Sequence, residues 1–321
     1  MNLSNATARS GPASPLPLAP LVLALAPVEG YNLTALPSVR VLRSDRPLSR
    51  TPVLYDPGIV IVCQGCKRGY FGQRTYVYDA NQYLAVSVPV PFTMETDASA
   101  ECPLLALYLH LDFPLAAELM LEIDRHDIST DVAQPQSMMS SPLDAAMQLS
   151  LERLLRALAD PVESGLFGPQ LLRELYYRVL TGPQGAVLRA ALSQQGRFGK
   201  IAKALERIHS DYAQPLDVAR LAQSAGMSTP SFHSHFKAVT CTSPMQYLKS
   251  TRLHQARLLM VREGMTAASA CHAVGFESTS QFSREFKRLF GLTPAKEARR
   301  MRDSFAIPQA WPGARYGTYH C

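Results

Sequence analysis

Two stretches of the sequence repeat one pattern of aromatic, basic and proline residues. The pattern, Phe-x3-Phe-Lys-x6-Pro, occupies residues 232–244 and 282–294, an offset of fifty positions. Phenylalanines four residues apart share one face of a helix, so each pair is expected to be buried while the residues between them face outward. The outward side chains include hydroxyl, imidazole and guanidinium groups, which can bond base edges or phosphates. The chemistry indicated is recognition of a polyanion by hydrogen bonding.

Each repeat is preceded by the signals of a helix, a turn and a second helix. A glycine stands in a helix-breaking position, Gly226 or Gly275, and a serine follows it, Ser228 or Ser278. Serine is a preferred helix N-cap, because its side-chain oxygen accepts from amides of the first turn. This is the order of elements in a helix-turn-helix. Two such units in one chain can place recognition helices about 34 Å apart, in successive major grooves of one duplex.

The positive charge of the chain is concentrated around these repeats. The whole sequence holds 32 Lys and Arg against 26 Asp and Glu, a net charge of +6. Residues 197–302 hold 17 basic and 7 acidic groups, whereas residues 1–196 hold 14 basic and 18 acidic groups. A segment of net charge +10 supplies non-specific attraction to phosphates. The slightly acidic two thirds before it are expected to form a controlling domain.

The pattern of the first two thirds changes from strands to helices. Short β-branched or aromatic runs, separated by turn residues, lie between Val39 and about Asp112. Many short strands at this spacing predict a sandwich or a small barrel. From Phe113 onward apolar residues recur at threes and fours, which predicts helices. The segment Asp127–Ser141, rich in Ser, Gln and Pro, is expected to be a loop between them.

Glycine and proline predict further breaks along the helical part. Helices are expected to break at Gly165–Pro169 and at Gly182-Pro183. Gly196 is expected to lie in a linker, and a new helix is expected to run from about Arg197 to Tyr212. The predicted divisions are 1–30, a disordered lead with a short packing helix; 31–196, a regulatory domain with a helical extension; 197–302, the domain with the paired helix-turn-helix units; and 303–321, a tail.

Composition limits the compartment in which the chain works. No run approaches the roughly 18 apolar residues that a transmembrane helix needs. The apolar stretch from Leu16 to Val28 is interrupted by prolines, which disfavours a signal peptide. The six cysteines lack the spacing of a disulfide framework, which favours a reducing compartment. We expect a cytoplasmic protein, associated with the nucleoid, that has no membrane partner.

Cys63 and Cys66 form the one closely spaced cysteine pair. They stand beside Lys67 and Arg68, and positive charges lower the pKa of a thiol. One hypothesis is therefore a dithiol that senses oxidants or electrophiles. The alternative is that one cysteine lies in the core and the other in a turn. Substitution of both cysteines by serine, with promoter output measured under oxidant, would distinguish the two.

The basic region resembles the DNA-binding domain of the AraC/XylS type over residues 197–302. The stretch that carries the resemblance is Ala273-Val274-Gly275-Phe276-Glu277-Ser278-x3-Phe282-Ser283-Arg284-x-Phe286-Lys287-x3-Gly291-x2-Pro294. The region before it resembles the N-terminal domain of AraC-type regulators, on Tyr55-Asp56-Pro57, Val62-Cys63-Gln64-Gly65-x-Lys67-Arg68, Tyr83-Leu84-x-Val86-Ser87-Val88 and Ser141-Pro142-Leu143-Asp144-Ala145. The resemblance implies an α+β protein: a cupin-like β-barrel with flanking helices, followed by an all-α domain with two helix-turn-helix units.

This resemblance also implies a function and partners. The chain is expected to be a bacterial, sequence-specific transcription regulator that binds double-stranded promoter DNA. An unidentified small molecule or a redox signal is expected to act through the N-terminal domain, with RNA polymerase as a partner if the output is activation. The apolar helices Leu143–Leu158 and Leu171–Leu180 are expected either to pack on the strands or to form the seam of a homodimer.

The resemblance assigns outward residues to contacts with DNA. The base-facing residues are Pro230, His233 and Ser234 in the first unit and Thr279, Ser280 and Arg284 in the second. The residues expected to hold the phosphate backbone are Ser228, Lys237, Ser278, Gln281, Lys287 and Arg288. Arg284 is the best candidate for reading a guanine edge, because a guanidinium can bond it in two places. For both helices phosphate contact is the alternative, and Arg252 and Arg257 are expected either to touch DNA or to bond internally.

One position departs from the repeat. Cys241 stands where the second copy has Gly291, at a helix C-cap that prefers glycine because its backbone is left-handed. Some backbone strain or an altered turn is expected there.

An enzyme of the cupin type is the competing hypothesis. Metal-binding cupins use a His-x-His with a later Glu and His, and residues 1–196 contain only His110 and His126. No metal, no cofactor and no catalytic residue is therefore expected, and metal analysis of the purified protein would distinguish the two classes.

Overall fold

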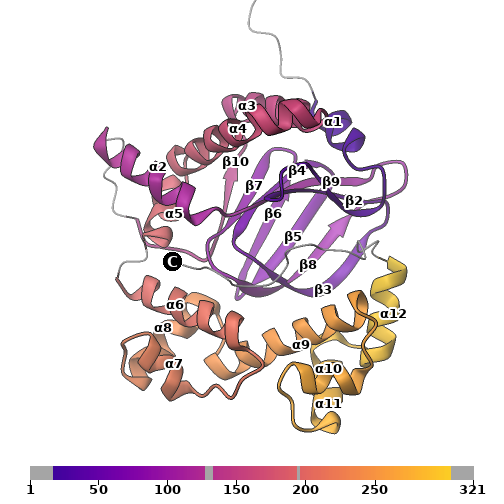
Figure 1. The fold of residues 1–321 in the computed structure, drawn as a ribbon, viewed down its shortest axis with the longest axis vertical. Helices are drawn as coiled ribbons and strands as arrows, with labels where there is room; N and C mark the ends of the chain where they lie inside the picture. Colours follow the sequence, from indigo (N-terminus) through magenta and orange to yellow (C-terminus); the bar gives the residue numbers. More distant parts are fainter. Residues whose placement is uncertain (1–16, 127–132, 194–195, 305–321) are drawn as a thin grey trace, which may run out of the picture.

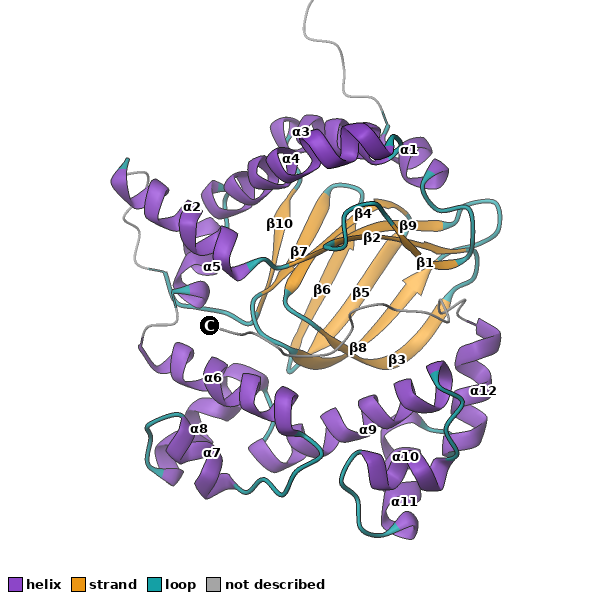
Figure 2. Ribbon diagram, viewed as in Figure 1, coloured by secondary structure: helices purple, strands orange, loops and turns teal. Residues whose placement is uncertain are grey.

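The strands of the N-terminal half form two antiparallel sheets that face each other (Figures 1 and 2). The computed structural model describes residues 17–126, 133–193 and 196–304. Within these ranges the larger sheet runs β1 (Gly30–Leu33), β2 (Val39–Ser44), β9 (Leu104–His110), β4 (Gly58–Gln64), β7 (Gln82–Val86) and β10 (Met138–Pro142). The smaller sheet runs β3 (Leu48–Tyr55), β8 (Val90–Asp97), β5 (Cys66–Phe71) and β6 (Arg74–Asp79).

Strand β4 shows why the larger sheet is so apolar. Its side chains alternate between two cores, as successive residues of a strand must. Ile59, Ile61 and Cys63 pack on the helical side, and Val60 and Val62 pack on the side that faces the smaller sheet. A sheet covered on both faces needs apolar residues at every position, which explains the continuous apolar run in β4.

Five helices cover the outer face of the larger sheet (Figure 1). Their bounds, in the described part of the chain, are α1 (Leu18–Ala24), α2 (Phe113–Arg125), α3 (Ala145–Leu158), α4 (Pro161–Thr181) and α5 (Gly185–Leu192). An aspartate caps three of them: Asp112, Asp144 and Asp160 each accept from an amide of the first turn. The short packing helix predicted near the N-terminus is confirmed as α1, and the lead before residue 17 lies outside the described residues.

The predicted fold class, a β-rich N-terminal domain with flanking helices followed by an all-α domain with two helix-turn-helix units, is confirmed. Three details of the fold differ from the predictions, and the first concerns the β module. The strand spacing predicted a sandwich or a small barrel, and the resemblance implied a cupin-like β-barrel. The described strands instead form two separate sheets, with β1 and β10 at the edges of one and β3 and β6 at the edges of the other. The module is a two-sheet sandwich.

The second correction concerns the predicted loop over Asp127–Ser141. Met138–Pro142 is a strand, β10, paired with β7 from Met138 opposite Val86 to Pro142 opposite Gln82. Met138 and Met139 are buried on opposite sides of the sheet. The segment has a polar composition, but it forms a strand because β7 offers a free edge for pairing. Residues 127–132 lie outside the described residues.

The third correction concerns Gly165–Pro169, which was expected to break a helix. These residues lie inside α4, which begins at Pro161 behind the Asp160 cap and continues to Thr181. Gly168 serves close packing: a Cβ there would lie 2.7 Å from a side-chain carbon of Leu36. The predicted break at Gly182-Pro183 is confirmed as the end of α4.

Seven helices of the described residues complete the chain: α6 (Gly196–Asp211), α7 (Val218–Ser224), α8 (Thr229–Thr240), α9 (Pro244–Arg262), α10 (Ala267–Ala273), α11 (Thr279–Phe290) and α12 (Pro294–Ser304). The apolar core between the two sheets continues into the helices α6 to α9 without interruption. A separate core joins the second half of α9 to α10, α11 and α12. The helical domain is therefore docked directly on the sandwich, below it in Figure 2.

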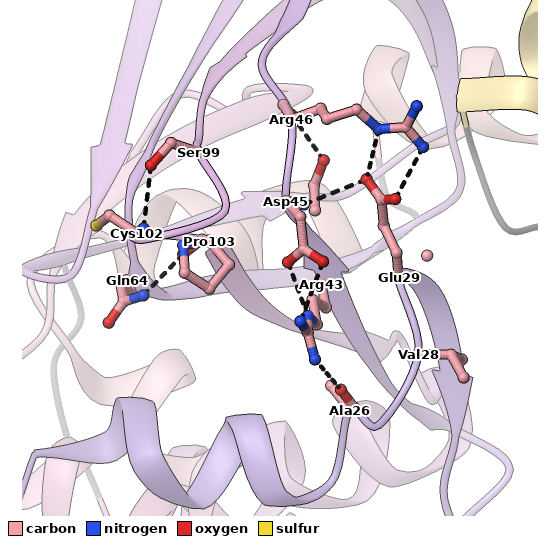
Figure 3. A network of polar contacts seen from close by, with 12 residues as sticks. Ala26, Val28, Glu29, Arg43, Asp45, Arg46, Gln64, Ser99, Cys102 and Pro103 are labelled. Carbon is pink, nitrogen blue, oxygen red and sulfur yellow. Dashed lines mark hydrogen bonds and ion pairs between the residues drawn. The ribbon is translucent and has the colours of Figure 1, made fainter.

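A polar network fastens the segment before β1 to the turn between β2 and β3 (Figure 3). Arg43 bonds both carboxylate oxygens of Asp45, at 2.8 and 3.0 Å, and the carbonyl of Ala26. Glu29 accepts from Arg46 and from the amide of Asp45. These bonds fix the path of the chain between α1 and the larger sheet.

Among the helices that the structure describes, none combines the length and the hydropathy that a bilayer span requires.

Candidate nucleic-acid interface

The first helix-turn-helix unit consists of α7, a turn at Gly226 and α8. Gly226 has φ +59°, in the left-handed region that favours glycine. Phe232 and Phe236 are fully buried, as their spacing predicts. The predicted cap is corrected: Ser228 occupies the N-cap position, but its side chain makes no capping bond. Pro230 has no amide hydrogen, so it removes one of the two donors that such a cap can use.

The second unit consists of α10, a turn at Gly275 and α11. Gly275 has φ +82°, and Phe282 and Phe286 are buried. Here the predicted cap is confirmed, because the Ser278 hydroxyl accepts from the amide of Gln281 at 3.3 Å. The repeat in sequence is thus a repeat in structure, and the two units lie side by side on α9 (Figure 1).

The residues assigned to DNA lie on the exposed sides of the two units. All of them are exposed: Ser228, Pro230, His233, Ser234 and Lys237 in the first unit, and Ser278, Thr279, Ser280, Gln281, Arg284, Lys287 and Arg288 in the second. Their division into base-reading and backbone-holding residues stays a prediction. What the structure supplies is two solvent-facing helices that carry hydrogen-bonding groups.

The charged residues of α11 differ in how they are held. Arg288 forms an ion pair with Glu285 at 2.5 Å, and Lys249 of α9 approaches the same carboxylate at 3.2 Å. In the part of the chain that the structure describes, Arg284 makes neither an ion pair nor a hydrogen bond. Arg284, Glu285 and Arg288, together with Ser278 and Gln281, line a hollow on the helix surface. Arg284 therefore keeps all its donors available for a partner.

Arg252 and Arg257, the two arginines of α9 left open by the sequence, both bond internally. Arg257 is buried and pairs with the fully buried Glu297 at 3.4 Å. Arg252 bonds main-chain carbonyls. Neither guanidinium is presented to solvent as Arg284 is.

The helical domain touches the sandwich through polar contacts as well as through the shared core. The hydroxyl of Tyr247, fully buried on α9, donates to the carbonyl of Pro89 at 2.8 Å. The hydroxyl of Ser137 donates to the carbonyl of Val239, in the last turn of α8, at 2.6 Å. These contacts connect the end of α8 and the first turns of α9 to the loops beside β7, β8 and β10.

Cys241 adopts the strained geometry that its position predicts. Its φ is +58°, and within the described ranges no other residue except glycine has a positive φ. The equivalent Gly291 has φ +79°. Cys241 also faces the sandwich, because a Cβ on Gly72 would lie 2.9 Å from its Sγ. The end of α8 thus holds a left-handed cysteine at the contact between the domains.

The environment of Cys63 and Cys66 opposes the expected effect of their basic neighbours. Burial raises the pKa of Cys63 to about 12, and burial also raises the pKa of Cys66 more than Arg68 lowers it. Burial is the largest cause for both thiols. Lys67 points into the sandwich, and Arg68 pairs with Asp97. The expected lowering of the thiol pKa is absent, and redox sensing by this pair stays a hypothesis.

The side chain of Lys67 is the functional candidate that the sequence analysis passed over. Strand β5 alternates half-buried and buried residues, and Lys67, Gly69 and Phe71 fall on the buried side. A lysine at an inward position of an alternating strand is the signal that could have identified it. No group of three His, Cys, Asp or Glu side chains suited to a metal ion occurs in the described residues.

Comparison with known proteins identifies both halves. The family described as the AraC-type transcriptional regulator N-terminus matches residues 35–187, and a helix-turn-helix domain family matches residues 221–300. An AraC-like transcription regulator of Streptomyces lividans is 36% identical over 94 residues, 29% of this chain and 31% of the relative. VirF, the virulence regulon transcriptional activator of Yersinia enterocolitica, is 23% identical over 232 residues, 72% of this chain and 77% of the relative.

Solved structures share the fold over most of the length. An apo form of ToxT from Vibrio cholerae superposes with a TM-score of 0.56 at 12% identity, covering 82% of this chain and 97% of that one. The chain spans about a third of the length of the curated Streptomyces relatives that it matches. With its AraC-type N-terminal domain and its helix-turn-helix domain, the chain belongs to the AraC-type family of transcription regulators.

Proposed function

We propose that this regulator is a bacterial protein that reads a specific promoter sequence with two recognition helices, α8 and α11, under the control of its N-terminal domain. The observation that carries the proposal is the duplicated unit, with exposed hydrogen-bonding side chains on two helices held by α9. The net charge of +10 over residues 197–302 supports it, because phosphate neutralisation supplies most non-specific affinity. Such a protein works in the cytoplasm, on the nucleoid.

Arg284 and Lys287 are expected to respond differently to substitution. Arg284→Ala should weaken binding of the selected sequence by about 1–3 kcal/mol and relax the preference at one base pair. Lys287→Ala should weaken all sequences alike and reduce the salt slope, because it removes one phosphate contact. Fluorescence anisotropy across a salt series, on a duplex enriched by the wild-type protein from a random library, measures both effects. Identical behaviour of the two variants would contradict this division of roles.

We further propose that the effector is a small molecule with a carboxylate and an apolar body, bound between the sheets at Lys67. Lys67 is 1% exposed and donates to the Tyr55 hydroxyl at 3.1 Å. Among the described residues no carboxylate pairs with it, and burial lowers its pKa. A buried ammonium without a counterion is costly. A bound carboxylate would satisfy it.

The surroundings of Lys67 connect this site to the DNA-binding domain. Tyr31 interacts electrostatically with Lys67 and also with Arg262, in the last turn of α9. A ligand that alters the charge at Lys67 would change this interaction, and an effector must favour one of two arrangements of the domains in this way. ToxT, which shares the fold, has been crystallised with an unsaturated fatty acid and with (E)-4-(8-methylnaphthalen-1-yl)but-3-enoic acid. Both are carboxylic acids with an apolar body.

Titration calorimetry with oleate tests this site. We expect the wild-type protein to bind oleate, and Lys67→Met to weaken binding about tenfold or more because a charge-assisted bond is lost. Oleyl alcohol, which has the same chain without the charge, is the control ligand and should bind weakly to both proteins. The assignment would be contradicted if the wild type and Lys67→Met bound oleate with equal affinity. It would also be contradicted if the wild type bound oleate and oleyl alcohol with equal affinity.

The remaining partners follow from the same function. Apolar residues of α3 and α4 within the predicted seam segments, such as Leu154 and Leu175, are buried in the core, so a homodimer would use other side chains. The exposed large apolar residues of α3 and α4 in the described part of the chain are the candidates: Leu149, Val162, Leu166, Phe167 and Tyr177. Sedimentation equilibrium tests the homodimer.

RNA polymerase is the partner if the output is activation. No catalytic step is proposed for the chain.

A further inference from the structure

Arg252 lies in the middle of α9, the helix that joins the two helix-turn-helix units, and bonds three main-chain carbonyls. Its Nε donates to Tyr212 at 2.7 Å, Nη2 to Gln214 at 2.9 Å and Nη1 to Gly275 at 3.0 Å. Tyr212 and Gln214 lie in the segment between α6 and α7, which leads into the first unit. Gly275 is the turn of the second unit. One guanidinium thus bonds both the segment that leads into the first unit and the turn of the second unit.

The same three carbonyls mark the place where the units touch. A Cβ on Gly275 would lie 2.5 Å from the carbonyl oxygen of Ala213, so the segment 212–214 packs directly on the turn between α10 and α11. The Tyr212 side chain packs against both the core that contains Phe236 and the core that contains Phe286. Arg252 lies beneath this contact and satisfies its carbonyls. Within the described residues it forms no ion pair that could explain its position otherwise.

Helix α9 alone fixes only part of the geometry that two-groove binding needs. A helix rises 1.5 Å per residue, so its length sets the distance between the units. Each unit packs on α9 through its own core, and rotation of one unit about the helix axis changes where its recognition helix points. A second attachment away from the axis is required to fix that rotation. The joint made by Arg252, Tyr212 and Gly275 is such an attachment.

We propose that Arg252 is a positioning residue that fixes the rotational phase of the two recognition helices and so restricts the protein to operators of one half-site spacing. This inference rests on the proposed function, because phase matters only if both helices enter the same duplex. The advantage of two linked binding units is lost when their geometry prevents simultaneous engagement. Arginine suits the role, because its planar fork presents five N–H donors in fixed directions, whereas lysine is a point charge on a flexible stem.

The test uses the full chain and three kinds of duplex. The first is a duplex enriched from a random library by the wild-type protein, the second has one half of that site replaced by random sequence, and the third has one or two base pairs inserted between the halves. The variants are Arg252→Lys and Arg252→Ala. Arg302→Ala is the matched control, because Arg302 of α12 also donates to a carbonyl, that of Met260 in α9 at 2.9 Å, but this bond lies beside the core of the second unit and does not reach the first.

We expect Arg252→Lys to bind the complete site about tenfold more weakly than the wild type, while its affinity for the half site stays within about twofold. The penalty for inserted base pairs should shrink in both Arg252 variants, because their units can rotate. Arg302→Ala should keep the wild-type penalty. If Arg252→Ala fails to fold, Arg252→Lys carries the test.

Two outcomes would overturn the inference. Complete-site and half-site affinities that fall in the same proportion would show that Arg252 supports folding alone, and an unchanged insertion penalty would show that it does not set the phase. Either result leaves the proposed function standing if the wild type prefers the complete site. A wild type that binds complete and half sites equally would overturn the two-helix function and this inference together.

Discussion

Glu297→Ala is expected to lower the free energy of unfolding of the second helix-turn-helix unit by about 3–5 kcal/mol, because it leaves a buried cation without its partner. Glu297 is fully buried, and Arg257 is 6% exposed. Burial lowers the pKa of Arg257 to about 10, so the guanidinium remains protonated at neutral pH. Arg257 also stacks over the Phe290 ring at 4.3 Å. Its position in the core therefore depends on the carboxylate.

Urea unfolding followed by circular dichroism measures this loss. Arg300→Ala is the matched control: Arg300 bonds the same carboxylate at 2.8 Å but is itself 31% exposed, so its removal should cost at most about 1 kcal/mol. The double variant Arg257→Met/Glu297→Leu should recover most of the stability, because an apolar pair carries no desolvation cost. If Glu297→Ala and Arg300→Ala cost the same, the buried pair is not what holds this unit.

Tyr247→Ala is expected to cost about 3–5 kcal/mol and to separate the unfolding of the sandwich from that of the first helix-turn-helix unit. Tyr247 is fully buried, and its ring meets that of Phe236 edge-on with centroids 5.4 Å apart. Its hydroxyl donates to the Pro89 carbonyl and lies 2.7 Å from Nε2 of His209. Burial lowers the pKa of His209 to about 4, so the ring is neutral at pH 7. Because the tyrosine proton goes to Pro89, Nε2 of His209 must be the donor to the hydroxyl oxygen.

Differential scanning calorimetry distinguishes the packing and hydrogen-bonding parts of this contact. Tyr247→Phe keeps the ring and removes the hydroxyl, so it should cost about 1–3 kcal/mol for the two groups left without a partner. In Tyr247→Ala the single transition should split into two. A phenylalanine variant as damaging as the alanine variant would assign the whole effect to the hydrogen bonds. Unchanged cooperativity in both would contradict the view that Tyr247 couples the domains.

Local patterns in the sequence were enough to predict the helix-turn-helix domain. Helical spacing determines that Phe232 and Phe236 share a buried face, and the left-handed turn determines that glycine occupies position 226. The strain at Cys241 followed from the same repeat, because its equivalent is Gly291. Each of these inferences depends on contacts within one turn of a helix or between adjacent elements.

Features that depend on distant partners were not predictable in the same way. The polar segment at Met138 forms a strand because β7 pairs with it, and nothing in its composition indicates that edge. Arg252 bonds main-chain carbonyls up to forty positions away in the sequence. Its residue type alone could not decide whether it contacts DNA or bonds within the protein. Burial raises the pKa of Cys66, and Lys67 lies on the opposite, inward face of β5, whereas adjacency in sequence suggested a lowered pKa.

The central claim is that two helices of one chain enter neighbouring major grooves of one duplex. Hydroxyl-radical footprinting of the full chain, together with guanine-methylation interference on a duplex selected by the wild-type protein, tests it most directly. We predict two patches of major-groove interference on one face of the duplex, one helical turn apart, with the patch assigned to α11 lost in Arg284→Ala. A single patch, or protection that is the same on random duplex, would contradict the claim.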